Sequence, residues 1–188
     1  MKKGFFALLV MLPLSLPVPA GADFAKFRDR NDTPSPLDIR WVSHGHRGKD
    51  VEHQIVTYKP WDVGDLRRNW FAMHVNLVSD DPDATEQDFG TSWDYAVSVS
   101  ARGKGLTAEI WREDVEPSQL LGEVPALHPT PKKLVIRIPR QFLDAAPGPY
   151  EWNAGSVFAG HGKGACAKKS CDDWTGKRWW NLEATHKG

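Results

Sequence analysis

The chain has little cysteine, no net charge and no long apolar run after its first 22 residues. Two cysteines in 188 residues are too few for a metal centre built from four thiolates, and neither a Cys-x-x-Cys redox motif nor a Gly-x-Ser-x-Gly nucleophile elbow occurs. The 24 basic and 24 acidic side chains cancel, so we expect no nucleic-acid partner. No repeat is visible, which disfavours propellers and solenoids.

The N-terminal segment predicts export. Met1-Lys2-Lys3 is positive, residues 4–16 are almost continuously apolar, and Ala20-Gly21-Ala22 fits a signal peptidase site. A membrane anchor is the alternative, but the apolar run is shorter than the ~20 residues that a span needs. We expect residues 1–22 to be a signal peptide and the mature protein to be secreted, with no membrane insertion after cleavage.

Export changes the interpretation of the two cysteines. Thiols outside the cytoplasm are normally oxidised, and Cys166 and Cys171 are separated by four residues. We expect a disulfide between them that fixes a C-terminal loop. Because the closed loop is short, its contribution to the free energy of unfolding should be small.

Apolar residues alternate with polar ones in several short segments, as in half-buried strands. We expect about eight strands, at residues 37–42, 51–58, 71–77, 95–101, 106–110, 119–124, 134–138 and 150–158. Residues 139–143 should form one short helical turn, and residues 61–69 a loop or a single turn. No helical segment is long enough for a parallel crossover, so the pattern predicts an all-β, antiparallel β-sandwich. It should form a single domain at residues 23–175, followed by a loose C-terminal tail at 176–188.

Acidic residues gather just before the first of these strands. Asp29, Asp32 and Asp38 lie within ten residues on a proline-rich loop, and Asp172-Asp173 directly follow Cys171. Calcium takes six to eight oxygen ligands, and short carboxylates on a rigid loop supply several of them. The alternative is that Asp29 and Asp32 cap turns through their own side chains.

Two other segments have weaker metal-binding patterns. The acidic residues between Ser79 and Gly90 offer a rival calcium site, but Glu86 stands where an EF-hand loop requires glycine, so a solvated loop is preferred. His44 and His46, with His53 opposite, have a spacing that suits zinc or copper if the segment is a strand. A turn at Gly45 and Gly48 would keep these rings apart.

The nine tryptophans are unusual for a chain of this length. Exposed indoles offer flat apolar surfaces on which sugar rings stack. Trp41 belongs to an expected strand, Trp111 directly follows one and Trp93 precedes one, so we take these three as candidate ligand-binding residues. The alternative is that each fills the core.

Several short motifs together resemble a known group of proteins. They are Asp29–Asp32, Pro36-Leu37-Asp38-Ile39 with Val42-Ser43-His44, Thr57-Tyr58 with Trp61, Val135–Pro139, Tyr150-Glu151-Trp152 and a terminal Cys-x4-Cys-Asp. Their order resembles secreted bacterial proteins of the actinobacterial type, related to family-9 carbohydrate-binding modules and DOMON-like domains. The resemblance implies a jelly-roll-like β-sandwich in which an N-terminal Asp loop and a C-terminal segment enclose calcium. It places Asp29, Asp32, Asp38 and one of Asp172 or Asp173, with Asp173 preferred, around the ion.

These observations favour a secreted, non-catalytic binding domain with a structural calcium ion. The expected partner is a glycan or a cell-wall polymer, and the expected oligomeric state is a monomer. Two alternatives stay open: a protein-interaction domain without glycan binding, and a polysaccharide hydrolase that uses carboxylates.

Overall fold

The computed structural model describes residues 25–47, 50–77, 94–113, 115–143, 149–158, 171–175 and 178–181. The expected signal peptide at residues 1–22, Trp93 and Cys166 lie outside the described residues. So does the acidic loop at 79–90.

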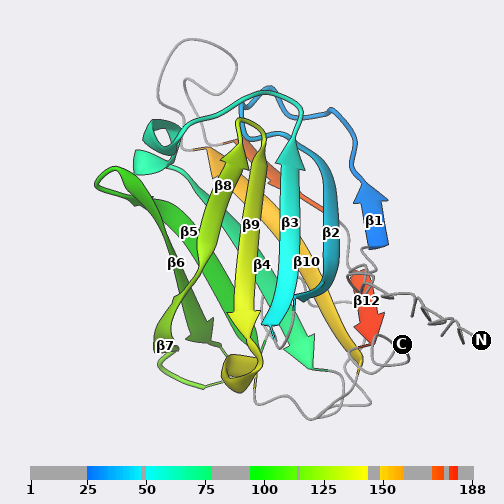
Figure 1. The fold of residues 1–188 in the computed structure, drawn as a ribbon, viewed down its shortest axis with the longest axis vertical. Helices are drawn as coiled ribbons and strands as arrows, with labels where there is room; N and C mark the ends of the chain where they lie inside the picture. Colours follow the sequence, from blue (N-terminus) through cyan, green and yellow to red (C-terminus); the bar gives the residue numbers. More distant parts are fainter. Residues whose placement is uncertain are drawn as a thin grey trace, which may run out of the picture.

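The described residues form two antiparallel sheets (Figure 1). The five-stranded sheet has the order β1 (Ala25–Arg28), β2 (Ile39–Arg47), β3 (Asp50–Thr57), β9 (Lys133–Pro139) and β8 (Ala126–Thr130). The seven-stranded sheet has the order β11 (Cys171–Trp174), β10 (Pro149–Phe158), β4 (Trp70–Leu77), β5 (Tyr95–Arg102), β6 (Gly105–Arg112) and β7 (Gln119–Val124), and β12 (Arg178–Asn181) also pairs with β10. Two 3-10 turns, η1 (Val63–Arg67) and η2 (Arg140–Leu143), join strands at the ends of the sheets.

The core lies between the two sheets. Strand β5 alternates buried Val97 and Val99 with half-buried serines and alanine, as a strand with one face inward requires. The apolar side chains that meet between the layers include Ile39, Val42, Ile55, Phe71, Val75, Ile110, Leu134, Ile136 and Trp152. Burying such side chains is the main favourable contribution to the free energy of folding.

The predicted sandwich is confirmed, with more strands than expected. All eight expected strands are present, and the structure adds β1, β8, β11 and β12, which have only four or five residues each. Strand β12 lies within the segment expected to be a loose tail. The turn expected at residues 139–143 is η2. Residues 61–69 were expected to form a loop or a single turn, and they contain the turn η1. Among the described residues, no helix is long and apolar enough to cross a membrane.

The segment between β1 and β2 reaches from one sheet to the other. Ser156 of β10 donates a hydrogen bond from its hydroxyl to the Leu37 carbonyl oxygen at 2.9 Å. The Ile39 amide donates to a carboxylate oxygen of Asp173 in β11 at 2.5 Å. These two bonds hold the edge of the seven-stranded sheet against the start of β2, and they position the site described next.

Candidate functional site

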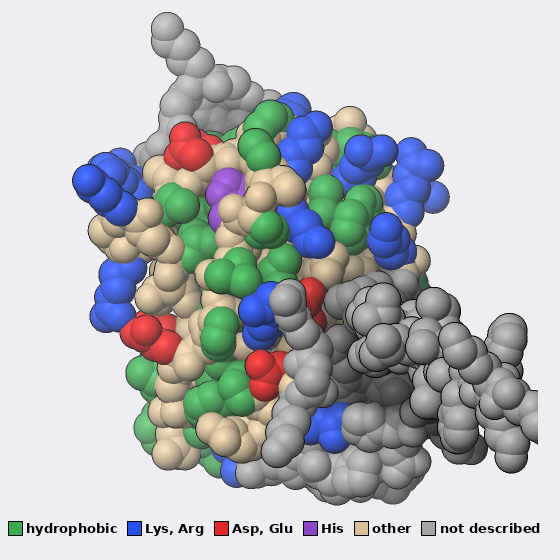
Figure 2. Space-filling view, viewed as in Figure 1, with side chains coloured by type: hydrophobic (Ala, Val, Ile, Leu, Met, Phe, Trp, Pro, Cys, Tyr) green, Lys and Arg blue, Asp and Glu red, His purple; other side chains and the backbone are tan. Residues whose placement is uncertain are grey.

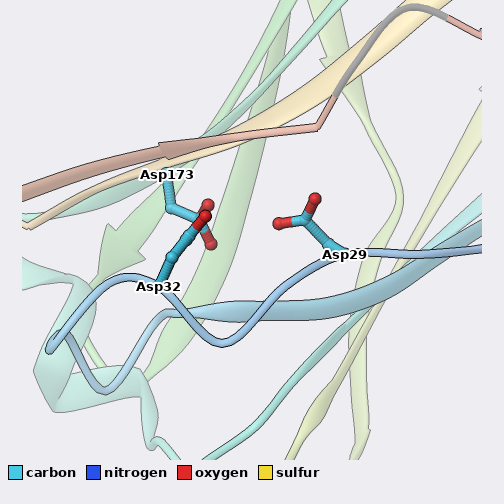
Figure 3. Close-up of side chains that lie close together, drawn as sticks. All are labelled: Asp29, Asp32 and Asp173. Carbon is cyan, nitrogen blue, oxygen red and sulfur yellow. The ribbon is translucent and has the colours of Figure 1, made fainter.

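Three carboxylates from distant parts of the chain meet where the two sheet edges come together. Asp29 directly follows β1, Asp32 lies in the segment that leads to β2, and Asp173 is in β11. Figure 3 shows the carboxylates of Asp32 and Asp173 close together, with that of Asp29 facing them across a small gap. The group therefore links the first described strand to a segment more than 140 residues later.

The spacing of the three groups suits a bound cation. One oxygen from each residue can be chosen so that all lie within 4.8 Å of one another. Oxygen ligands stand 2.3–2.6 Å from Ca²⁺, so two ligands of one ion are separated by at most about 5 Å. Asp29, Asp32 and Asp173 could therefore hold one metal ion, and three carboxylates with no sulfur or imidazole suit a hard cation.

The segment that carries Asp32 is fixed at several points. The Tyr58 hydroxyl donates to the Asp29 carbonyl oxygen at 2.8 Å, and the Lys59 ammonium donates to the Pro34 carbonyl oxygen at 3.2 Å. The Leu37 amide donates to the Ser35 hydroxyl at 2.9 Å, which closes a local turn. A loop held in this way presents its carboxylates without a large entropy cost on binding.

Asp173 is an acid with a strongly raised pKa. Its side chain is buried, and this burial raises its pKa to about 7. The hydrogen bond from the Ile39 amide acts in the opposite direction, while the nearby Asp29, Asp38 and Asp32 also contribute to the raised pKa. A divalent cation would reverse this balance because it stabilises the ionised carboxylates.

Asp38 is not among the three clustered carboxylates, so its expected role as a metal ligand stays a prediction. The three clustered carboxylates are those of Asp29, Asp32 and Asp173. Asp38 is fully buried, and neither of its carboxylate oxygens accepts a hydrogen bond of ordinary geometry from a described residue. Burial raises the pKa of Asp38, and Asp32 raises it further, while the Thr33 backbone amide and Lys59 lower it. Asp38 immediately precedes β2 and lies between the buried residues Leu37 and Ile39.

The choice between Asp172 and Asp173 follows from strand geometry. Adjacent residues of a strand point to opposite faces, and in β11 Asp173 is buried while Asp172 is exposed. Cys171, which precedes them, is not a free thiol. Its expected partner Cys166 lies outside the described residues, so the disulfide between them stays a prediction.

The histidines form part of the core. His44 and His53 are paired across β2 and β3, with ring centroids 6.4 Å apart, and both are buried. The Trp152 indole N–H donates to Nδ1 of His44 at 2.8 Å, and its ring lies 4.4 Å from that of His53. Among the described side chains, no group of three potential metal ligands includes them. The side chain of His46 is not among those described.

The tryptophans expected to bind a ligand do not share one surface. Trp41 in β2 alternates with buried Val42, and Trp111 in β6 alternates with buried Ile110, so both indoles point away from the core. Their strands belong to different sheets, and the outer faces of a two-layer sandwich lie on opposite sides of the molecule. Trp41 and Trp111 therefore cannot clamp one ligand between them.

Two further tryptophans lie on the same outer face as Trp111. Trp174 in β11 and Trp70 in β4 are 37% and 39% exposed. Trp174 is paired with Gly155, where an added Cβ would lie 2.3 Å from the indole, so the ring rests directly on the backbone of β10. The sequence pattern could have revealed Trp70, because it is out of phase with the buried Phe71 and Val75. Strand β11 is too short to show such a pattern.

Small residues separate these indoles on the outer face of the seven-stranded sheet. The register aligns Trp174 with Gly155, Ala72 and Ser98 on successive strands. With about 4.8 Å between strands, Trp174 and Trp70 are roughly 12 Å apart, and Trp174 and Trp111 are separated by about 19 Å across the sheet.

The sequence was compared with protein-family models and with curated proteins. No protein-family model and no curated protein matches the sequence. Of the resemblance to family-9 carbohydrate-binding modules and DOMON-like domains, the structure supports the fold alone, an all-β sandwich of two sheets.

Proposed function

We propose that this protein is an exported, non-catalytic domain that binds a glycan or a cell-wall polymer. The binding surface is the outer face of the seven-stranded sheet, with Trp70, Trp111 and Trp174. Calcium at Asp29, Asp32 and Asp173 holds the edge of this sheet in place.

One observation carries the proposal for a glycan: three indoles share one outer sheet face, and two of them are exposed by more than a third. Sugar rings present apolar C–H faces that stack on indoles.

The support for calcium is the chemistry and the position of the carboxylates. Three oxygens come from the protein, and backbone carbonyls and water can complete a shell of six to eight. The ion would join the segment after β1 to β11, where Trp174 is the next residue after Asp173. This arrangement is also what membership of the carbohydrate-binding and DOMON-like sandwiches would imply, and we include that membership in the proposal.

Replacement of the exposed indoles tests the proposed surface. The mature protein should sediment with purified peptidoglycan or with insoluble cellulose, and Trp174→Ala should weaken that binding by about tenfold, since stacking contributes about 1–1.5 kcal/mol per ring. Gly155→Ala should have a similar effect, because the new methyl group displaces the Trp174 ring without removing it.

The matched control is Leu127→Ala, which removes an exposed apolar side chain from β8 of the other sheet. Binding that survives Trp70→Ala, Trp174→Ala and Gly155→Ala unchanged, in variants that melt normally, would reject the surface. Failure to bind any of a panel of neutral and cell-wall polysaccharides would favour the protein-interaction alternative.

The hydrolase alternative has one observation in its favour. Asp173 has a raised pKa and lies beside Asp29 and Asp32, as the acid of a carboxylate pair does. If the group is catalytic, the protein should release reducing sugar from a polysaccharide, and Asp173→Asn should abolish that release. We expect no turnover.

A further inference from the structure

Five cationic side chains gather at the β1 edge of the five-stranded sheet. Lys26, Arg28 and Arg30 alternate along β1 and its continuation, while Phe27 and Asp29 between them are less exposed. Arg40 in β2 and Lys59, whose ammonium reaches the Pro34 carbonyl oxygen, add two more exposed charges. Figure 2 shows Lys and Arg side chains grouped on the upper right of this face, over β1 and the segment that follows it.

The alternation is regular because β1 stays paired beyond its last residue. Arg28 is opposite Trp41, and the Asp29 amide donates to the Arg40 carbonyl oxygen at 2.9 Å. Successive residues of an extended chain point to opposite faces, so Lys26, Arg28 and Arg30 face outward together at intervals of about 7 Å.

Among the described residues, no salt bridge includes Lys26, Arg28, Arg30, Arg40 or Lys59. Lys59 acts on the nearby buried carboxyl of Asp38, whose pKa it lowers. Lys26 lies over the Trp41 ring at 4.9 Å, and Arg40 lies over the Tyr58 ring at 6.0 Å. Aromatic contacts hold these two cations and leave their charge available.

A hollow lies beside this strip. It has a volume of about 450 Å³ and is lined by Arg28, Asp29, Arg30, Asn31 and Tyr58. Two guanidinium groups and an amide offer several hydrogen-bond donors to an anionic group seated there. The carboxylate of Asp29 turns toward Asp32 and Asp173, as Figure 3 shows, and a cation held by those three would offset their charge.

We propose that this edge binds the charged groups of an anionic glycopolymer. The sugar-linked carboxylate, sulfate or phosphate groups of such a polymer would pair with Arg28 and Arg30 in the hollow and with Lys26, Arg40 and Lys59 beside it. The half-buried indole of Trp41 lies within the strip and provides an apolar contact for a sugar ring. This surface belongs to the other sheet from Trp70 and Trp174, so the proposal goes beyond the glycan face and stands independently of it.

An extended polymer fits better than a small anion. The cations are spread along a strand at regular intervals, so several of them can contact charges of one polymer chain at once. Such multivalent contact increases the affinity. Without residues 1–22, which contain two lysines and no acid, the chain has 22 basic and 24 acidic side chains. Attraction must therefore come from this local group and should be screened strongly by salt.

Dextran sulfate and uncharged dextran provide a matched pair of probes with the same backbone. The mature protein should bind dextran sulfate in a calorimetric or light-scattering titration at low salt, and should not bind dextran. The double variant Arg28→Gln/Arg30→Gln should weaken this binding by about tenfold and reduce its salt dependence.

The control is Arg67→Gln/Arg68→Gln, which removes two exposed charges at η1, on the other side of the molecule in Figure 1. It should bind dextran sulfate as the unaltered protein does. Equal losses in both double variants would overturn the proposal, because binding would then follow total charge. Tighter binding to phosphatidylglycerol vesicles than to dextran sulfate would also overturn it, since the edge would then be a membrane contact.

The two proposals fail separately. Trp70→Ala and Trp174→Ala should leave dextran sulfate binding unchanged, and the Arg28→Gln/Arg30→Gln variant should still sediment with neutral polysaccharide. Loss of dextran sulfate binding on substitution of Trp174 would refute the separate anionic edge.

Discussion

Asp173 connects several features of the site through one side chain. It accepts a hydrogen bond from Ile39, it faces Asp29 and Asp32, and its burial raises its pKa to about 7. An acid with these properties is a poor contributor to stability when it is ionised alone and a good ligand when a cation is bound. The free energy of unfolding should therefore depend on pH and on calcium together.

Without calcium, the melting temperature of the mature protein should fall as the pH rises from 5 to 8. The folded-state pKa of Asp173 lies above its unfolded value of 3.8, so its stabilising contribution is complete below about pH 4 and is lost as the pH passes through 7. In the Asp173→Asn variant, the melting temperature should fall by about 5 °C less over this pH range than in the unaltered protein.

Calcium should reverse the trend, because it binds the ionised carboxylates and its stabilising effect grows with pH. Scanning calorimetry at four pH values, with chelator and with calcium, measures both effects. Asp172→Asn is the control, since this neighbour is exposed and outside the group. A slope that is the same in Asp173→Asn and Asp172→Asn would contradict the role given to Asp173.

At the scale of elements, the sequence predicts long strands well and short ones poorly. Strands such as β4, β5 and β10 have eight to ten residues and show clear alternation, so their positions follow from the sequence. Strands β1, β8, β11 and β12 have four or five residues, and tertiary pairing rather than local pattern determines them. Trp174 was missed for this reason, while Asp173 was found because it lies just after a cysteine.

The hydrogen bond from Ser156 to Leu37 should be important for the link between the sheets. Ser156→Ala leaves the buried Leu37 carbonyl oxygen without this donor, which costs about 1–3 kcal/mol. The free energy of unfolding should fall by that amount in urea titration, and calcium affinity should fall with it because the segment carrying Asp32 is less firmly held.

Ser100→Ala provides the comparison, since Ser100 is a half-buried residue of β5 that faces away from the core. It should change the free energy of unfolding by less than about 0.5 kcal/mol. If Ser156→Ala lowers stability but leaves calcium affinity unchanged, the segment does not depend on this bond for its ligand geometry.

At the scale of the whole molecule, the sandwich carries three chemically different surfaces. The carboxylate group lies where β1 meets β11, the indoles of Trp70 and Trp174 lie on one outer face, and the cations of β1 lie on the other. The sequence predicted the sandwich and the meeting of Asp29 and Asp32 with Asp173. It could not predict that Trp41 and Trp111 face opposite ways, because that depends on which sheet each strand joins.

The central claim is that Asp29, Asp32 and Asp173 bind calcium and thereby join the two sheets. Melting of the mature protein in EDTA and in excess calcium tests it most directly. At a calcium concentration of about 100 times the dissociation constant, we expect a rise of roughly 5–10 °C at pH 7.5, since binding then contributes about 2.7 kcal/mol. This rise should be lost in Asp29→Asn and Asp173→Asn and kept in Asp172→Asn. A melting temperature that does not respond to calcium in the unaltered protein, or that responds equally in all three variants, would contradict the claim.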